Sequence, residues 1–589
     1  MLPITLIVAP LVAMLIIPFI RGWRHVAYLS IAASIANLAL LPFVSEGTSS
    51  ITWFSVAGAT FHISISVGTL NMILLYMVLI IAPLIFIYSA GFMKKPSEQK
   101  RFHEEMLAFY VAMLVFAISG NFITLFIAWE FLSLTSYLLI GFWHGREKAT
   151  VSAREAITIV LIGDIALLAS IAIFWNAYGT LEFSSIIKAS TAATGAVPVP
   201  ASAIALLMIA IFTKSAQFPF HEWLPDAMEG PTPVSAFLHS STMVKAGVFV
   251  AILLFPIFSS SKTAMLLFTV FGMATAVIAT LNAMQEKHIK RIPAYSTIAE
   301  LSIMLAAVGV GALAAAVYFF FAQAFYKALI FFSSGAVMDA TGKEDIYEIS
   351  GLKRNKLIYI STVFGVLALA GFVPFDTFFS NLGIGAAFST NIAAYAIMLL
   401  ISLGTSFFIF RWLFLISKKE RSIETEINYD STPISMKYPM VVLAALAIAA
   451  SFAYLPIIRA VSANSSSGIS IFGAAIETAI VAAGAYIGYL AFSKGSLKAN
   501  VQKLNLIIYN SILMKSLYSF FCEFVYLISE GVGMFDYYFN EALDWLGHVT
   551  LAFGEATRRS VNGQLSSYMI AFWIGFAALM VYVLLIVVR

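Results

Sequence analysis

The chain has 589 residues, of which 61% are hydrophobic and 11% are charged, whereas soluble proteins are roughly 45–50% apolar and about 25% charged. This composition excludes a water-soluble enzyme and indicates a polytopic membrane protein. The net charge of +4 is too balanced to suggest nucleic acid as a partner, and the single cysteine, Cys522, excludes an internal disulfide and an iron–sulfur cluster. We also find no phosphate-binding loop and no dinucleotide-binding motif, so we expect no cofactor in this chain.

Apolar segments that are long enough to cross a bilayer recur along the whole chain. A spanning helix needs about 20 mostly apolar residues, and about sixteen segments meet that need. The predicted spans are 1–20, 25–44, 66–91, 104–120, 121–142, 151–176, 200–220, 231–257, 262–284, 290–310, 313–338, 356–385, 390–416, 436–456, 470–493 and 564–588. The first segment has no small-residue cleavage site after a basic start, so we expect a retained helix.

The loop charges predict the orientation. Lysine and arginine concentrate in loops that follow odd-numbered spans, for example Lys94, Arg146, Lys287, Lys343 and Lys418. The positive-inside rule then places the N-terminus outside and the odd loops in the cytoplasm. We expect an integral protein of the cytoplasmic, or an equivalent inner, membrane.

Seven charged side chains lie within the predicted spans: Glu130, Asp164, Lys214, Lys245, Glu300, Lys327 and Asp376. A charge at the bilayer centre costs roughly 2.5–3.5 kcal/mol, so these groups must pair with one another or line a hydrated path. A salt bridge that only fixes helix packing is the simpler alternative for Glu130.

One lysine lies close to a proline that interrupts its span, because Lys214 is followed by Pro219 in the same segment. Lys327 and the break at Pro374, beside Asp376, look like a second copy of this arrangement. Proline removes a backbone hydrogen bond and breaks a membrane helix, and broken helices in both halves of a bundle are typical of two inverted repeats around an ion path. If the distance between Glu130 and Lys214 changes, the proton affinity of the lysine changes with it, so a proton pump is physically possible.

Two histidines flank the segment after Lys214. His239 is predicted either as a buried, hydrogen-bonded imidazole or as a proton relay. His221 is expected at a helix end, in an ordinary surface role. The sequence around it has no second histidine at helical spacing, so it does not predict a zinc site.

Residues 497–562 contain many charges and no proline, and their apolar residues recur at helical spacing. This pattern predicts a long amphipathic lateral helix, with kinks at Gly531 and Gly533, followed by a last span. Because such a helix is longer than one helical bundle is wide, we expect it to contact neighbouring membrane subunits.

Several segments together resemble the antiporter-like subunits of respiratory complex I. The matching segments are WEFLSLTSY at 129–137, KSAQ at 214–217, LPDAMEGPTPVSA at 224–236, HSSTMVKAG at 239–247, AYST at 294–297 and AFYKAL at 324–329. The number of spans, the lateral helix and the final helix after NGQL at 562–565 resemble the L-type subunit.

The resemblance implies roles for the charged residues. Glu130 and Lys214 correspond to the ion pair of a first half-channel, and Asp164 to the acid of the sixth helix. His239 and Lys327 correspond to a central relay. Protons would pass along this axis when partner subunits, which would carry the quinone, flavin and iron–sulfur clusters, reduce quinone.

The second half of the chain departs from the family pattern. Phe319 and Gln323 stand where histidines are frequent, and Asn381 stands where a lysine is usual. Glu300 occupies a position where glutamine is common. We therefore expect Asp376 or Glu300 to replace the missing terminal lysine.

The domain organisation follows from these observations. We expect N-terminal helices over 1–103, two antiporter-like repeats over 104–257 and 258–417, further helices over 418–496, the lateral helix over 497–562 and an anchor over 563–589. The favoured function is proton translocation in a complex I-like assembly. Alternatives are one component of an Mrp-type cation/proton antiporter, a membrane component of a membrane-bound hydrogenase, and a purely structural clamp.

Overall fold

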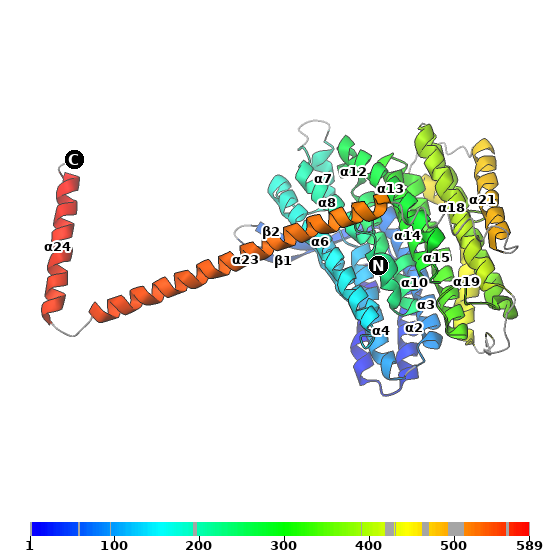
Figure 1. The fold of residues 1–589 in the computed structure, drawn as a ribbon, viewed down its shortest axis with the longest axis horizontal. Helices are drawn as coiled ribbons and strands as arrows, with labels where there is room; N and C mark the ends of the chain where they lie inside the picture. Colours follow the sequence, from blue (N-terminus) through cyan, green and yellow to red (C-terminus); the bar gives the residue numbers. More distant parts are fainter. Residues whose placement is uncertain are drawn as a thin grey trace. The chain divides into compact units, whose positions relative to one another are not determined.

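The computed structural model describes residues 3–56, 59–94, 96–192, 197–389, 391–418, 429, 432–461, 471–492, 512–560 and 565–587. The chain divides into two compact units, Met1–Lys498 and Ala499–Arg589. The first unit is a bundle of helices, and the second consists of two helices in its described part (Figure 1).

The elements of the first unit follow one another as α1 (Thr5–Ile16), η1 (Ile17–Phe19), α2 (Trp23–Leu40), η2 (Leu41–Phe43), β1 (Gly47–Val56), β2 (Ala59–Val67), α3 (Thr69–Phe92), α4 (Pro96–Ala117), α5 (Phe122–Ile140), α6 (Glu147–Tyr178), α7 (Phe183–Ser190), α8 (Ala201–Lys214), α9 (Trp223–Asp226), η3 (Ala227–Glu229), α10 (Thr232–Ser240), α11 (Met243–Leu253), α12 (Phe255–Ser259), α13 (Lys262–Gln285), α14 (Arg291–Gly309), α15 (Leu313–Thr341), η4 (Leu352–Arg354), α16 (Lys356–Ala370), α17 (Asp376–Phe388), α18 (Ile392–Ile416), α19 (Ile434–Phe452), α20 (Tyr454–Val461) and α21 (Ile471–Phe492). The second unit contains α23 (Ile512–Ser560) and α24 (Leu565–Val587).

Every predicted span coincides with a helix or with two helices separated by a break. Among the described residues, 11 helices are long and apolar enough to cross a membrane, and shorter apolar helices lie at Thr5–Phe19, Ala201–Lys214, Lys356–Ala370 and Tyr568–Leu579. The chain is therefore a helical polytopic membrane protein, as its composition predicts.

Helix α15 forms the centre of the bundle. It packs against α3, α10, α14, α16, α17 and α19, and nearly all of its side chains from Ala315 to Val337 are buried. The apolar stretch of the neighbouring helix α14 is completely buried. Helices that are apolar on every side pack inside a bundle rather than at its surface, which explains why the polar groups on these two helices meet one another.

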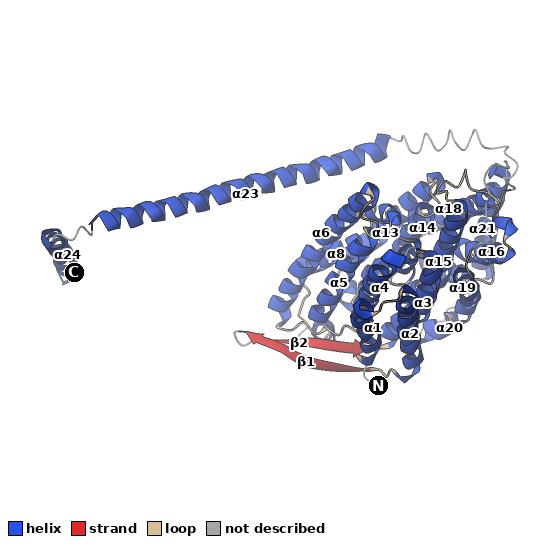
Figure 2. Ribbon diagram, turned by 90° about the horizontal axis from the view of Figure 1, so that it is seen from below, coloured by secondary structure: helices blue, strands red, loops and turns tan. Residues whose placement is uncertain are grey.

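The structure corrects the expectation of a purely helical protein. Strands β1 and β2 pair as an antiparallel hairpin, from Gly47 opposite Val67 to Val56 opposite Ala59 (Figure 2). Polar and apolar residues alternate along β2 from Phe61 to Val67, which suits a strand with two different faces. The hairpin packs through β2 against α3 and α5.

The two proline breaks are confirmed. Helix α8 ends at Lys214 and α9 begins only at Trp223, and α16 ends at Ala370 before α17 begins at Asp376. The segment predicted as one span over 231–257 contains a further break, which we did not expect, between α10 and α11.

In the second unit, α23 is continuous through Gly531 and Gly533, so the expected kinks do not interrupt this helix. Its 49 residues correspond to about 74 Å at 1.5 Å per residue. The first part of the predicted lateral helix, 497–511, lies outside the described residues.

Candidate functional site

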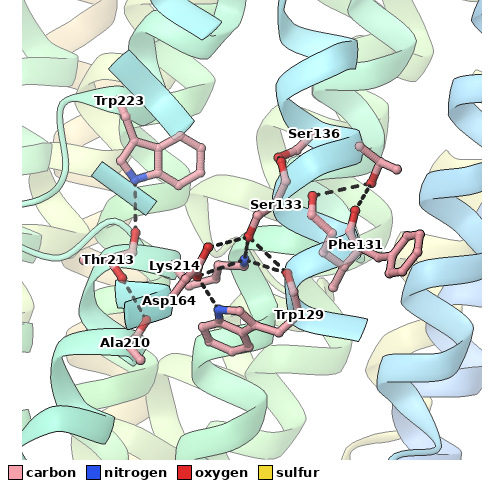
Figure 3. Close-up of polar contacts among 11 residues, drawn as sticks. Trp129, Phe131, Ser133, Ser136, Asp164, Ala210, Thr213, Lys214 and Trp223 are labelled. Atoms are coloured by element: carbon pink, nitrogen blue, oxygen red, sulfur yellow. Dashed lines mark hydrogen bonds and ion pairs between the residues drawn. The ribbon is translucent and has the colours of Figure 1, made fainter. Parts of the chain in front are cut away.

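Three helices bring polar side chains together around Lys214 (Figure 3). Lys214 is the last residue of α8, Trp129 and Ser133 lie on α5, and Asp164 lies on α6. Both Lys214 and Asp164 are buried. A cation at the C-terminus of a helix is favoured by the helix dipole, so the end of α8 suits an ammonium group.

The ammonium of Lys214 is well bound in this site. Its Nζ donates to the Trp129 carbonyl at 3.1 Å and to the Ser133 hydroxyl at 2.5 Å. The same nitrogen lies 3.8 Å from Asp164 Oδ1 and 4.6 Å from the centroid of the Trp129 ring. Together these groups replace most of the hydration that the ammonium loses on burial.

The carboxylate of Asp164 is held by two donors. Trp129 Nε1 donates to Oδ1 at 2.6 Å, and the Ser133 hydroxyl donates to Oδ2 at 2.9 Å. Asp164 therefore has a defined position relative to Lys214. Ser133, which we did not predict, contacts both partners of the ion pair.

Glu130 does not take the place that we predicted for it. It lies on α5, half-buried, and it makes no ion pair within 4 Å with Lys214, whereas Asp164 does. The reason is helical geometry, because adjacent residues of a helix point in directions about 100° apart. Trp129 and Ser133 are four residues apart and share the face toward Lys214, whereas Glu130 lies to the side of that face and interacts with Lys214 and Asp164 only at longer range.

The chain leaves α8 abruptly after Lys214. Ala216 has a positive φ of 50°, and the amide of Gln217 bonds back to the Phe212 carbonyl at 2.8 Å. Trp223 Nε1 donates to the carbonyl of Thr213 at 3.0 Å. The side chain of Trp223 thus adds a donor to a carbonyl in the last turn of the helix, where intrahelical partners run out.

A second buried ion pair lies between α14 and α15. Lys327 Nζ is 2.8 Å from Glu300 Oε2, and it donates to the Ser296 hydroxyl at 2.7 Å. Gln323 Nε2 donates to the same oxygen of Glu300 at 2.9 Å. Glu300 is thus the partner of Lys327. Gln323, one of the departures from the family pattern, helps to hold this carboxylate.

Two predicted residues, Lys245 and His239, are buried and form no ion pair with any residue that the structure describes. Lys245 Nζ donates to the Phe320 carbonyl at 2.5 Å and lies 3.4 Å from Met77 Sδ. His239 packs against the Phe331 ring at 4.7 Å, and neither of its ring nitrogens has a hydrogen-bond partner within the described part of the protein. This excludes the simple alternative of an imidazole that other protein groups satisfy.

Asp376 begins α17 and is completely buried. Its Oδ1 accepts a hydrogen bond from the Thr377 amide at 2.8 Å, whereas Oδ2 has no partner among the described residues. A carboxylate in the first turn of a helix is stabilised by the helix dipole. The Asp376 side chain retains one oxygen for a further proton or water contact.

The loop after the break in α8 is more buried than we predicted. His221 is a buried side chain rather than a surface one, and its Nε2 lies 3.3 Å from Glu222 Oε1. Burial, together with the charges of Asp226 and Glu155, raises the pKa of Glu222 to about 7. Burial lowers the pKa of His221 to about 4.

Sequence reasoning missed the buried carboxyl of Glu477 on α21, which is 3% exposed. The signal was present, because Glu477 is a charged residue inside the predicted span 470–493. Arg411 on α18, which donates to the Ala283 carbonyl at 3.1 Å, was missed in the same way. In the described ranges, no three His, Cys, Asp or Glu side chains are grouped as metal ligands.

Two family models match parts of the chain. Residues 119–409 match the family described as "NADH:quinone oxidoreductase/Mrp antiporter, TM", and residues 53–103 match "NADH-Ubiquinone oxidoreductase (complex I), chain 5 N-terminus". The chain is 30% identical to the chloroplastic NAD(P)H-quinone oxidoreductase subunit 5 of Chaetosphaeridium globosum, over 90% of this chain and 87% of that protein.

The chain is also 32% identical to a Na(+)/H(+) antiporter subunit from Alkalihalophilus pseudofirmus, over 64% of this chain. The match spans only half of that antiporter subunit, 50% of its length. The solved structure of the Mrp complex from Dietzia sp. DQ12-45-1b has the same fold, with a TM-score of 0.73 at 22% identity. That match covers 99% of this chain and 63% of the chain in the complex.

Proposed function

Because the chain belongs to the family of membrane subunits shared by NADH:quinone oxidoreductases and Mrp antiporters, we propose that it translocates protons in a complex I-like assembly. The observation that carries this proposal is the pair of buried lysine–carboxylate contacts, Lys214 with Asp164 and Lys327 with Glu300. Charged groups inside membrane helices are expensive, and such pairs mark proton paths.

The first pair suggests how a proton is held and released. While Asp164 lies next to Lys214, the carboxylate stabilises the ammonium. When the carboxylate moves away, the buried ammonium loses this stabilisation and gives up its proton. Each change of one pKa unit corresponds to about 1.4 kcal/mol, so a few units match the work of moving a proton against about 150–200 mV.

The groups between the two pairs would carry the proton through the bundle. His239 interacts electrostatically with Lys327, and Lys245 interacts with both Glu300 and Asp376. With Glu130 beside the first pair, these residues make up the set that the sequence predicts. The imidazole of His239 needs water or a proton for its two unpartnered nitrogens, which suits a relay.

The finer assignments are part of the proposal. We place the chain as an L-type subunit with about sixteen spans, an N-terminus outside, and two inverted repeats over 104–257 and 258–417. The quinone, flavin and iron–sulfur clusters would reside in partner subunits. The lateral helix α23 would contact other membrane subunits.

An Mrp-type cation/proton antiporter subunit is the second candidate. Two observations favour it, namely the 32% identity to a Na(+)/H(+) antiporter protein and the fold shared with an Mrp complex. The sequence match to the complex I-type relative nevertheless extends over 90% of this chain, whereas the sequence match to the antiporter protein extends over 64% of it. We therefore rank the complex I-like assembly first.

Purification of the tagged native protein in mild detergent, followed by mass spectrometry, distinguishes the two candidates. We expect iron–sulfur and quinone-binding subunits to be retained. Small hydrophobic antiporter subunits without any redox protein would instead identify the antiporter, and hydrogenase subunits would identify a membrane-bound hydrogenase.

A substitution then tests proton transfer itself. Lys214→Ala should lower proton pumping by the native assembly at least fivefold, measured as acidification-dependent dye quenching in membrane vesicles. Lys188→Ala, which changes an exposed lysine on α7, is the matched control and should pump normally. Normal pumping by Lys214→Ala would contradict the proposed function.

A further inference from the structure

A cavity of about 630 Å³ lies between α15, α17, α18, α20 and α21. Its lining is mostly alanine, glycine and aliphatic residues, and its rim includes the exposed Gly311 and Ser389 at helix ends. Among the lining residues, all of them described, Glu477 is the one that carries a charge.

The carboxyl of Glu477 is held in a defined position. Asn381 Nδ2 on α17 donates to Glu477 Oε1 at 2.7 Å, and the same nitrogen lies 3.5 Å from the Ser402 hydroxyl on α18. Tyr395 on α18 interacts electrostatically with Glu477, and Tyr454 on α20 lines the same cavity. The groups that face Glu477 are therefore neutral amides and hydroxyls.

This environment differs from those of the two ion pairs. Asp164 and Glu300 each lie next to a lysine. Glu477 has no cation within ion-pair distance among the described residues, and it borders a space large enough for several water molecules. A carboxyl in such a position can gain and lose a proton without breaking a salt bridge.

Helix α17 carries polar groups near both Glu477 and the central pair. Asp376 interacts electrostatically with Glu300, the partner of Lys327. Asp376 and Asn381 lie on the same helix, α17, and Asn381 binds Glu477 directly. The second half of the bundle thus has titratable groups at Lys327, Asp376 and Glu477, of which Glu477 lines the cavity.

The cavity is at the weakly charged end of the bundle. It lies where α14 ends, α15 begins and α17 ends, whereas Lys287, Lys290 and Arg291 lie at the opposite end of α14. No lysine or arginine is present among the lining residues. With the orientation proposed above, the cavity opens on the outer side of the membrane.

We propose that Glu477 is the proton-release group of the second half of the bundle. This inference rests on the proposed function and deepens it. A proton leaves the Lys327 ammonium, which becomes a neutral amine, and binds to the Asp376 carboxylate, whose Oδ2 has no other partner among the described residues and which then releases the proton. It binds to the Glu477 carboxylate, which becomes a carboxylic acid. The acid then gives the proton to water in the cavity and returns to a carboxylate.

Two substitutions in the native assembly test the role of Glu477. Glu477→Gln keeps the size of the side chain and an oxygen that accepts the Asn381 hydrogen bond, but it cannot carry a proton. We expect pumping to fall at least fivefold at an unchanged amount of assembled complex. Glu477→Asp remains titratable and should recover at least half of the wild-type rate. Its pH profile should move toward lower pH, because aspartate is the stronger acid.

Glu182→Gln provides the matched control. Glu182 also accepts a hydrogen bond from an asparagine, Asn121, at 2.8 Å, but it lies in the loop before α7. This variant should pump at the wild-type rate. If Glu477→Gln pumps normally while Lys214→Ala does not, Glu477 only forms a structural hydrogen bond between α17 and α21. The inference is then wrong, although the proposed function stands. If neither variant changes pumping, both are wrong.

A measurement on the unmodified protein covers the case in which Glu477 variants do not assemble. A hydrophobic carbodiimide adds to protonated carboxyls in apolar surroundings, and mass spectrometry locates the adduct. We expect the adduct on Glu477 to increase as pH falls from 9 to 6. An unlabelled Glu477 at every pH would show that it does not exchange protons with the cavity, and would overturn the inference.

Discussion

Lys214 and Asp164 show how a membrane interior accommodates two opposite charges. The ammonium has two hydrogen bonds besides its ion pair, and the carboxylate has two donors of its own. Pairing alone does not repay the loss of hydration, but pairing combined with satisfied hydrogen bonds does. This is why Trp129 and Ser133 matter as much as the charged residues.

Asp164, rather than Glu130, should therefore determine the stability of the first site. Asp164→Asn leaves a buried ammonium without its carboxylate and should lower the free energy of unfolding by about 3 kcal/mol. Unfolding by denaturant in detergent measures this change. Glu130→Gln is the control and should have little effect, since Glu130 is half-buried and outside the pair.

The double variant Asp164→Asn with Lys214→Met removes both charges. It should regain most of the stability that Asp164→Asn loses, because no unpaired charge remains. A double variant as unstable as Asp164→Asn would show that the ion pair does not explain the effect.

The raised pKa of Glu222 predicts that the stability of the protein depends on pH. Its pKa in the folded protein, about 7 because of burial and neighbouring acids, is above its value in the unfolded chain. The folded state thus holds the proton more tightly, and this group's contribution to stability falls as pH rises through the range from about 4.5 to 7. Glutamine does not ionise, so the Glu222→Gln variant does not lose this stability as pH rises.

The advantage of Glu222→Gln over the wild type should therefore grow between pH 5.5 and 8. After allowance for solvent screening, we expect on the order of 1–2 kcal/mol. Melting temperatures of the purified assembly at the two pH values measure it. Glu530→Gln, an exposed position on α23, should show no such trend, and equal trends in both variants would refute the assignment.

At the scale of elements, the close approach of α6 and α8 places Asp164 beside Lys214. Gly163 makes this approach possible, because a Cβ at this position would overlap the Thr213 side chain and lie 3.2 Å from Ala210 Cα. A residue with any side chain at position 163 must push the two helices apart.

Gly163→Val should therefore damage the first site without changing any charge. We expect a loss of about 1–3 kcal/mol in stability from overpacking and a clear fall in proton pumping. Gly145→Val is the control, because a Cβ at Gly145 meets nothing within 4 Å. Full pumping in the Gly163→Val variant would mean that the spacing of α6 and α8 is not critical.

The helix breaks differ in how clearly the sequence predicts them. Pro219 and Pro374 mark two of them in the sequence. The break between α10 and α11 has no proline, and the Thr242 hydroxyl there donates to the Phe237 carbonyl at 2.6 Å. A threonine side chain that competes for a backbone carbonyl gives only a weak signal in a sequence.

At the scale of the whole molecule, the chain consists of two units with different surroundings. The first unit encloses its polar groups within a packed bundle. On α23 the large apolar side chains are exposed, for example Tyr526, Phe535, Trp545 and Phe553 at 67%, 71%, 64% and 76%. Exposed apolar surface of this extent marks a site for partner proteins or lipid.

A chain that ends after Lys498 tests this division. The bundle should still insert and accumulate, because it is a compact unit of its own. Partner subunits should be recovered at a tenth of the normal amount or less in mild-detergent purification. Full recovery of the partners would show that the second unit does not hold the assembly together.

The sequence by itself determined the features that depend on local composition. Hydropathy placed the membrane helices, prolines placed two of the breaks, and charges inside apolar segments identified the residues of the two ion pairs. These features follow from the properties of one segment at a time, since each helix satisfies its own backbone within the membrane.

Only the tertiary structure decided which of these residues meet. Lys214 pairs with Asp164 and not with Glu130, Lys327 pairs with Glu300, and Glu477 joins Asn381 across 96 residues of sequence. Such contacts depend on the rotation and spacing of whole helices, which a glycine such as Gly163 or a hydroxyl such as that of Ser133 can set. For the same reason, the sequence identified the charged residues of the two ion pairs but not how they pair.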